Sequence, residues 1–289
     1  MNILQKKKYW IWLSRVKNLG SKRIQKLLEN YKTPEKIYQL DMHELMKNQG
    51  IGEQMARNIL DDKIRKNMNK YINYMNENKI DIVTINEQEY PPILKNIYDP
   101  PIILYVKGNK NILSKKSIAI IGCREASDYG KSAAKYFAYN LAKENINIVS
   151  GLAKGIDSFS HIGAVIAKSP TVAVVGNGLD MVYPKENTEL VDNIIKYGGA
   201  IVSEYPLGTK PEKMNFPARN RIISGMSNAI VVIEAKEKSG TLITVDFALE
   251  QGRDVYVVPG NINSANSVGT NELIKEGAKV VTHYGELLL

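Results

Sequence analysis

From residue 80 onward, short apolar runs rich in β-branched residues alternate with stretches of helical periodicity. Several of these runs are unbroken, as expected of parallel strands covered on both faces. Helices are predicted between them, for example over 131–143 and 243–251. The alternation predicts a doubly wound α/β fold. Strands are predicted at 82–84, 103–106, 118–121, 146–149, 172–175, 200–202, 230–233, 255–258 and 280–282.

The first quarter of the chain has a different pattern. Residues 9–30 predict two helices separated by a turn at Leu19-Gly20-Ser21, and a second pair turns at Gly50-Ile51-Gly52. Glycines permit such tight bends, and the following helix start can hold a phosphate oxygen. This pattern is typical of a helix-hairpin-helix or SAM-like domain. We expect it to span residues 1–72, with the α/β domain at 80–289.

Length and composition narrow the class of protein. A chain of 289 residues suggests about two domains at roughly 150 residues each. The hydrophobic content of 44% and charged content of 24% are ordinary for a globular protein. One cysteine excludes an internal disulfide, and three scattered histidines make a poor metal set. No apolar stretch approaches the roughly 20 residues of a membrane span, so a cytoplasmic protein without membrane contact is expected.

The net charge of +9 is unevenly distributed. Residues 1–70 contain 16 Lys+Arg and 7 Asp+Glu, whereas the remaining residues contain 23 of each. A basic segment on a neutral body favours a polyanion such as nucleic acid. Lys22, Arg23 and Arg57 lie close enough to the two turns to help bind a phosphate there. Tandem helical hairpins also serve as protein-interaction modules, so both interpretations remain open for residues 1–72.

Polar and glycine residues follow the predicted core strands. The loops at 122–130, 150–157, 176–185 and 234–241 are rich in Gly and Ser and carry several cations. Ligands of doubly wound sheets bind at this carboxyl edge, where glycines allow close approach and helix starts favour anions. The loops lack both a complete Gly-x-Gly-x-x-Gly and a Walker A pattern. The sequence therefore predicts phosphate binding without a dinucleotide cofactor.

A basic cluster with one aromatic residue occupies 213–221. Arg219 and Arg221 can each bridge phosphate oxygens, and Phe216 can stack on a base. The competing interpretation is that Phe216 anchors the loop and the arginines pair with acids such as Glu204 and Glu234. We expect at least one of the two arginines to be structural.

Two candidate catalytic groups are weak. Asp157 and His161 are four residues apart and can share a helix face, but no Gly-x-Ser-x-Gly elbow accompanies them. A histidine near a helix start is more often packed or capping. Cys123 precedes Arg124, which could lower the pKa of the thiol, but no histidine partner is evident.

Six ordered motifs resemble the DNA-processing protein A (DprA/Smf) family, over about residues 10–285. Tyr90-Pro91 and Pro100-Pro101 resemble that family's lead-in to the core. The motifs are Gly-x-Arg-x-x-Ser-x-Tyr-Gly (122–130), Ser-Gly-x-Ala-x-Gly-Ile-Asp (150–157), Gly-x-Gly-Leu-Asp-x-x-Tyr-Pro-x-x-Asn (176–187), Phe-Pro-x-Arg-Asn-Arg-x-Ile-Ser-Gly (216–225), Ser-Gly-Thr-Leu-Ile-Thr (239–244) and Leu-Glu-Gln-Gly-Arg-x-Val-x-x-Val-Pro-Gly (249–260).

The resemblance implies an extended Rossmann-like core and a dimeric protein without known catalysis. Such proteins protect incoming single-stranded DNA and help load the RecA recombinase during natural transformation and recombination. By resemblance, the DNA-contacting arginine is Arg124, the pocket lysine is Lys185, and the Lys-x-x-Phe pair is Lys213 and Phe216. The dimer and recombinase surface is expected at about 245–289. The full set of expected core contacts is Arg124, Ser127, Lys154, Lys185, Lys213, Phe216, Arg219, Arg221, Gly240 and Thr241.

The sequence departs from the family pattern in places, and alternative functions therefore remain open. Many members add a C-terminal winged helix, which is not expected in a chain ending at Leu289. A phosphoribohydrolase-like enzyme on a similar fold would need a Pro-Gly-Gly-x-Gly-Thr loop followed by a catalytic Glu. Here the corresponding stretch is only Lys238-Ser239-Gly240-Thr241. A protein-interaction hub without DNA binding is the third hypothesis.

Overall fold

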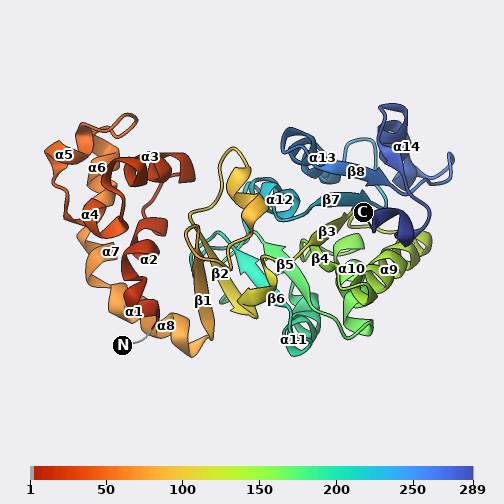
Figure 1. Cartoon of the computed structure of the whole chain (residues 1–289), viewed down its shortest axis with the longest axis horizontal. Helices are drawn as coiled ribbons and strands as arrows, with labels where there is room; N and C mark the ends of the chain where they lie inside the picture. Colours follow the sequence, from red (N-terminus) through yellow and green to blue (C-terminus); the bar gives the residue numbers. More distant parts are fainter. Residues whose placement is uncertain (1–2, 289) are drawn as a thin grey trace.

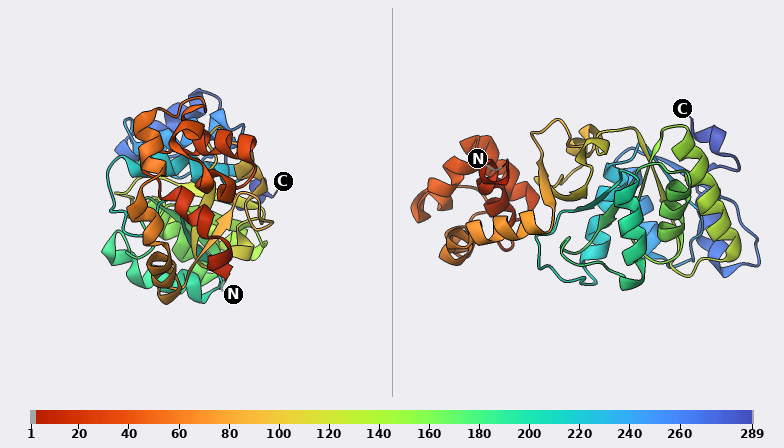
Figure 2. Two further views of the ribbon diagram at one scale, coloured as in Figure 1. Left: turned by 90° about the vertical axis from the view of Figure 1, so that its left-hand side faces the viewer. Right: turned by 90° about the horizontal axis from the view of Figure 1, so that it is seen from below.

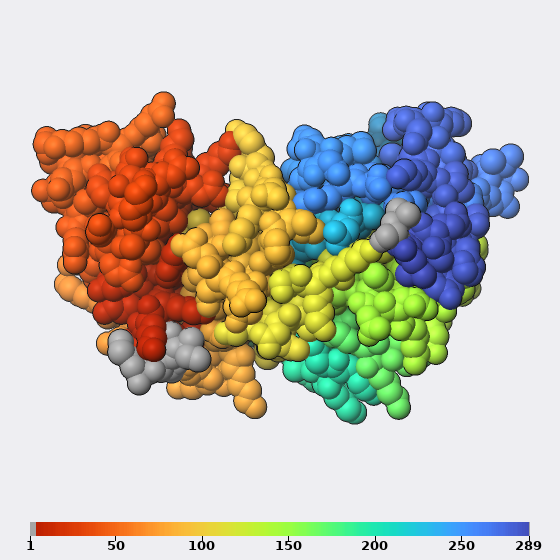
Figure 3. Space-filling model, in the orientation of Figure 1, coloured from red at the N-terminus to blue at the C-terminus, as the bar shows by residue number. Residues whose placement is uncertain are grey.

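The computed structural model describes residues 3–288 and shows an elongated molecule (Figures 1 and 2). Helices fill one end, which we call the helical segment (residues 3–77), and the remainder is the α/β segment (residues 80–288). The space-filling view shows the stretch that contains β1 (Ile80–Thr84) and β2 (Ile103–Gly108) between the helical end and the rest of the molecule (Figure 3). Within residues 3–288, no helix is both long and apolar enough to cross a membrane.

The helical segment contains the two predicted hairpins. Gly20 and Gly52 are the N-caps of the third and sixth helices, and Gly50 adopts φ +82°, which favours glycine. Leu27 and Ile59 are buried, so the apolar faces of these two helices point inward. The helices are α1 (Ile3–Lys6), α2 (Lys8–Ser14), α3 (Ser21–Tyr31), α4 (Pro34–Gln39), α5 (Met42–Met46), α6 (Glu53–Ile59), α7 (Asp62–Lys66) and α8 (Met68–Glu77).

Helix α8 runs through the expected domain boundary at residue 72. Ile72 and Met75 are fully buried, whereas the polar residues around them face outward. Residues 73, 74, 76 and 77, which follow this boundary, are exposed and form the solvent face of an amphipathic helix. The helical segment therefore continues to Glu77, directly before β1.

The α/β segment is built on one nine-stranded sheet of order β1-β2-β6-β5-β4-β3-β7-β8-β9. β1 pairs antiparallel with β2 and β2 with β6, and all other neighbours are parallel. Each strand lies at a predicted apolar run. The strands after β2 are β3 (Ser117–Ile121), β4 (Asn147–Ser150), β5 (Thr171–Val175), β6 (Ala200–Ser203), β7 (Ala229–Val232), β8 (Asp254–Val257) and β9 (Lys279–Val280).

Helices cover both faces of this sheet. In β3, Ile118 and Ile120 join one buried cluster, whereas Ala119 and Ile121 join another, as strand alternation requires. The first cluster contains buried side chains of α9 and α10, which therefore cover one face of the sheet. The second contains side chains of α12, α13 and α14, which cover the other face. This doubly wound, mainly parallel arrangement confirms the predicted Rossmann-like fold. The helices are α9 (Asp128–Lys143), α10 (Ile156–Ile166), α11 (Thr188–Lys196), α12 (Asn215–Gly225), α13 (Gly240–Glu250) and α14 (Val268–Lys275).

Short 3₁₀ turns complete the connections, and one of them precedes β2. They are η1 (Pro92–Asn96), η2 (Lys110–Ile112), η3 (Lys185–Asn187), η4 (Ala265–Ser267) and η5 (Tyr284–Leu287).

The two segments share a hydrophobic core. Trp12 of α2 belongs to the same buried cluster as Ile103 and Tyr105 of β2. Polar contacts cross the same boundary: the Ser14 and Tyr105 hydroxyls lie 2.8 Å apart, and the Leu207 amide donates to the Tyr71 hydroxyl at 2.8 Å. The helical segment is therefore packed against the sheet rather than tethered to it.

Candidate nucleic-acid interface

A small pocket of about 120 Å³ lies at the carboxyl edge of the sheet, above β3, β4 and β5. Its walls come from the three loops that follow these strands and from the start of α12. This is the edge at which open α/β sheets bind ligands. The lining residues are Arg124, Leu152, Ala153, Lys154, Val175, Gly176, Asn177, Tyr183, Pro184, Phe216 and Arg219.

The position of Arg124 depends on a glycine in the neighbouring loop. Gly155 has φ +74°, and a Cβ there would lie 2.4 Å from the carbonyl oxygens of both Cys123 and Arg124. The Ile156 amide then donates to the Cys123 carbonyl at 3.2 Å. The loop after β4 can therefore pack directly on the backbone of the loop after β3. Arg124 remains exposed at the pocket mouth.

Two aromatic rings form one wall of the pocket. The rings of Phe216 and Tyr183 lie 5.7 Å apart between centroids and are tilted by 31°. The Arg124 guanidinium carbon lies 5.8 Å from the Phe216 ring centre, within cation–π range. Tyr183 is 46% exposed and was not among the predicted contacts. The sequence could have marked Tyr183 as a pocket residue, because it directly precedes Pro184-Lys185 in a loop that follows a predicted strand.

The floor of the pocket holds a buried arginine. Arg219 is 6% exposed and donates through Nη1 to the Val174 carbonyl. A Cβ on Gly151 would meet both the Asp157 carboxylate and the Arg219 guanidinium, so these groups meet above the same glycine. Burial raises the pKa of Asp157 to about 6, although nearby Arg219 favours the charged form. The floor therefore presents a cation whose compensating acid is mostly protonated below about pH 6.

Three predicted lysines lie at or near the rim. Lys154 lines the pocket and forms an exposed 2.7 Å ion pair with Glu186. Lys185 is exposed and follows the lining residue Pro184, and Lys213 is exposed three residues before Phe216. The Asn187 amide ties the loop after β5 to the loop after β4 by donating to the Leu152 carbonyl at 2.8 Å.

Arg221 does not reach the pocket. It is buried and pairs with Asp99 and Glu204, each at 2.8 Å. Burial disfavours its charge, but the two carboxylates hold the pKa of Arg221 above its usual value. Residues two apart on a helix point in nearly opposite directions, so Arg219 and Arg221 cannot both face the pocket. Arg221 was predicted to contact DNA, but its burial and its two ion pairs give it a structural role instead.

Three other expected contacts also lie outside this pocket. Ser127 caps α9 by accepting from the Gly130 amide at 3.1 Å, and its hydroxyl donates to the buried Glu234 carboxylate. Ser127 and Glu234 line a separate cavity of about 400 Å³ near the ends of β7 and β8. Gly240 and Thr241 begin α13, which Ser239 caps.

The candidate catalytic groups are packed in the interior. The Nε2 of His161 donates to the Gly151 carbonyl at 2.6 Å, and burial lowers its pKa to about 4. Burial and the nearby Glu234 raise the pKa of Cys123 to about 12, opposite to the lowering considered from its neighbour Arg124. A neutral buried imidazole and a protonated thiol are not activated groups. Within residues 3–288, no three His, Cys, Asp or Glu side chains gather as a metal site.

The predicted cations of the helical segment remain outside the pocket. The Lys22 ammonium lies over the ring of Tyr98, and Arg57 pairs with Glu53 at 2.5 Å on the exposed face of α6. Arg23 lines a cavity of about 240 Å³ between α3 and the turn at residues 48–51. The cations of the two hairpins therefore do not line the pocket itself.

The fold and the pocket define a class of protein: a Rossmann-like α/β protein with a small cationic, aromatic-walled pocket at the carboxyl edge of its sheet. A family model for DNA recombination-mediator protein A matches residues 81–289, and one for the SAM-like helix-hairpin-helix tandem matches residues 13–64. The chain belongs to the DNA recombination-mediator protein A family, as its motifs predicted.

Individual relatives agree over most of the chain. DNA processing protein DprA of Bacillus subtilis is 44% identical over 71% of this chain and 69% of its own length. Protein Smf of Synechocystis is 34% identical over 97% and 71%. The structure of DNA processing protein A from Streptococcus pneumoniae matches with TM-score 0.85 at 36% identity, covering 97% of this chain and 96% of that one.

A second solved structure is that of DNA processing protein A from Helicobacter pylori, described for its single-stranded DNA binding mode. It matches with TM-score 0.65 at 30% identity, over 73% of this chain and 95% of that one.

Proposed function

We propose that this protein binds single-stranded DNA through the carboxyl-edge pocket and acts as a recombination mediator. The observation that carries the proposal is the juxtaposition of Arg124, Phe216 and Tyr183 above the buried Arg219. Cations bind phosphate oxygens, and aromatic rings stack on bases that a single strand leaves accessible. Lys154, Lys185 and Lys213 extend the cationic surface around the pocket, with Lys22, Arg23 and Arg57 as an auxiliary contact.

Affinity for oligo-dT and for a duplex of equal length, measured across a salt series, tests this proposal. We expect a strong preference for the single strand and a salt slope of about −0.7 per phosphate neutralised. Arg124→Ala should weaken single-strand binding at least about tenfold, because it removes a charged contact. Lys143→Ala, which removes an exposed cation from α9, is the matched control. Equal weakening by both variants, or equal binding of duplex, would reject the pocket assignment.

We further propose that the protein acts without catalysis in the cytoplasm, protecting single-stranded DNA and helping to load RecA during natural transformation and recombination. The packed His161 and Cys123 support a non-catalytic role. Nuclease protection and the rate of RecA filament assembly, with and without the protein, test the two activities. Release of free base from nucleoside monophosphates would instead favour the phosphoribohydrolase-like alternative.

A homodimer through the late part of the core, at about residues 245–289, completes the proposal. Leu249, Val268 and Val280 are exposed apolar side chains in this region, and β9 is an edge strand. Sedimentation of wild type and of Val280→Asp tests it. We expect dimers for the wild type and monomers for the variant, whereas identical sedimentation of both would move the interface elsewhere.

A further inference from the structure

The carboxyl edge of the sheet extends beyond the pocket toward the helical segment. β2 runs antiparallel to β6, with Tyr105 opposite Ser203 and Gly108 opposite Ala200. The start of β2 therefore lies at the same edge as the end of β6. Residues 98–101, which we call the lead-in, directly precede β2 and continue the edge on which the pocket loops lie. Figure 1 shows the chain before β2 between α12 and α3.

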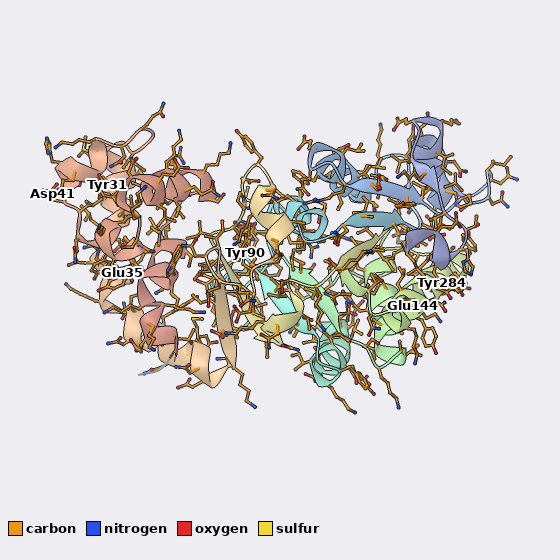
Figure 4. All side chains as sticks on the ribbon, in the orientation of Figure 1. Tyr31, Glu35, Asp41, Tyr90, Glu144 and Tyr284 are labelled. Atoms are coloured by element: carbon orange, nitrogen blue, oxygen red, sulfur yellow. The ribbon has the colours of Figure 1, made fainter. Side chains whose placement is uncertain are left out.

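The lead-in is fixed to the helix that carries the pocket residues. Arg221 of α12 binds the Asp99 carboxylate at 2.8 Å. The Tyr90 hydroxyl donates to the Pro101 carbonyl at 2.7 Å, and Figure 4 shows Tyr90 near the junction of the two segments. Because α12 also supplies Phe216 and Arg219, the lead-in and the pocket are both in contact with this one helix.

The basic helix α3 packs on the same lead-in. The Ser21 hydroxyl donates to the Asp99 carbonyl at 3.4 Å, and the Gln25 amide donates to the Pro100 carbonyl at 3.3 Å. These bonds place the beginning of α3 at the carboxyl edge of the sheet. Lys22, in the first turn of this helix, thereby lies beside the lead-in residue Tyr98.

An exposed aromatic ring lies at this junction. Tyr98 is 83% exposed, and the Lys22 ammonium covers one face of its ring. Arg23 and Lys26 are exposed on the same helix, and the acid nearest to them in α3 is Glu29. A ring that remains so exposed gains little from burial, so core packing does not explain its position. We call Tyr98, Lys22, Arg23 and Lys26 the α3 patch.

We infer that the α3 patch binds a second stretch of the same single-stranded DNA that occupies the pocket. An exposed aromatic ring beside several cations suits a flexible strand, whose bases can stack while its phosphates meet the lysines and the arginine. The inference rests on the proposed function. It adds that the binding surface runs along one edge, from the pocket across the lead-in to α3.

Oligonucleotide length separates the two sites. A short oligo-dT of about 6 nucleotides should occupy the pocket alone, whereas one of about 25 nucleotides should also reach the α3 patch. Tyr98→Ala should weaken binding of the long oligonucleotide about tenfold because base stacking is removed, and binding of the short one should be unchanged. Tyr98→Phe should retain the affinity. The combined change Lys22→Gln and Arg23→Gln should flatten the salt slope for the long oligonucleotide by about 0.7 for each phosphate that is no longer neutralised.

The structure offers a matched control. Tyr139 of α9 is 37% exposed, and Lys143 lies over its ring, so this pair repeats the cation–aromatic contact outside the patch. Tyr139→Ala and Lys143→Gln should leave both affinities unchanged. Circular dichroism of each variant establishes that it is folded.

Four outcomes would overturn the inference. The first is a long oligonucleotide that binds the wild type no more tightly than the short one. The second is a Tyr98→Ala variant with unchanged affinity for the long oligonucleotide. The third is equal weakening for both lengths, which would mean that Tyr98 only supports the pocket. The fourth is loss of duplex binding alone, which would assign the patch to duplex DNA. Failure of the wild type to bind either oligonucleotide would instead reject the proposed function itself.

Discussion

At the scale of single residues, two arginines of one helix have opposite roles. Arg219 turns into the pocket, where its guanidinium forms the cationic floor, and Arg221 turns into an ion-pair network with Asp99 and Glu204. Their sequence context is nearly the same. The difference arises because a two-residue step on a helix reverses the direction of the side chain. The local pattern could establish that one arginine is structural, but not which one.

Asp157 and His161 also show how burial changes a pair of titratable groups. The folded protein holds a proton on Asp157 up to about pH 6, whereas the carboxyl pKa is ordinarily 3.8. It loses the His161 proton already near pH 4, whereas the ring pKa is ordinarily 6.5. In both cases burial disfavours the charged form.

These shifts predict opposite effects on stability. Between about pH 4 and 6 the folded state binds more protons at Asp157 than the unfolded chain does, so this residue makes stability fall as pH rises. At His161 the folded state binds fewer protons, so stability rises with pH over about 4 to 6.5. Each effect is on the order of 3 kcal/mol, and in the wild type they largely cancel.

Urea unfolding at several pH values tests the cancellation. Relative to wild type, Asp157→Asn should gain free energy of unfolding as pH rises from about 4 to 6, and His161→Gln should lose it. If the profiles of both variants run parallel to that of the wild type, neither group titrates as described.

At the scale of elements, the strands were predicted well and the helix ends less well. Each apolar run became a strand of the sheet. However, α9 begins at Asp128 rather than at 131, and α13 begins at Gly240 rather than at 243. Ser127 and Ser239 cap these helices earlier than the apolar periodicity begins. A capping serine marks the start of a helix more accurately than the apolar pattern does.

The turn between β4 and α10 gives a prediction at this scale. Gly155→Ala should destabilise the protein by more than about 1 kcal/mol, because the residue has positive φ and its Cβ would strike two carbonyl oxygens. It should also weaken DNA binding, because one of those carbonyls belongs to Arg124 and its displacement would move that residue. Thermal unfolding and oligo-dT affinity measure the two effects.

Gly240→Ala is the matched control for that variant. No heavy atom lies within 4 Å of a Cβ placed there, so we expect little change in stability. Because Gly240 was also predicted as a DNA contact, unchanged oligo-dT affinity would remove it from the site. Equal destabilisation by both substitutions would contradict the argument from backbone geometry.

At the scale of the whole molecule, the shared core makes the two segments one folding unit. Both tryptophans of the chain, Trp10 and Trp12, lie in α2 of the helical segment. Trp12 is packed in the cluster that also contains Ile103 and Tyr105 of β2. A natural fluorescent probe therefore reports on one end of the molecule, whereas circular dichroism reports on all of it.

We predict a single cooperative transition on that basis. Denaturant curves followed by tryptophan fluorescence and by far-ultraviolet circular dichroism should coincide, because the helical segment cannot leave without exposing the face of β2. An earlier fluorescence transition would mean that the helical segment unfolds independently.

The sequence by itself determined the class of fold, the place of each strand and the edge of the sheet at which the pocket lies. It could do so because apolar periodicity reports burial, and because loops after parallel strands meet at one edge. Only the tertiary structure decided which predicted cations share a pocket. Arg221 meets Asp99, a residue 122 positions away, and α3 meets the lead-in more than 70 positions away. Such contacts depend on how whole elements pack, and no local pattern in the chain encodes them.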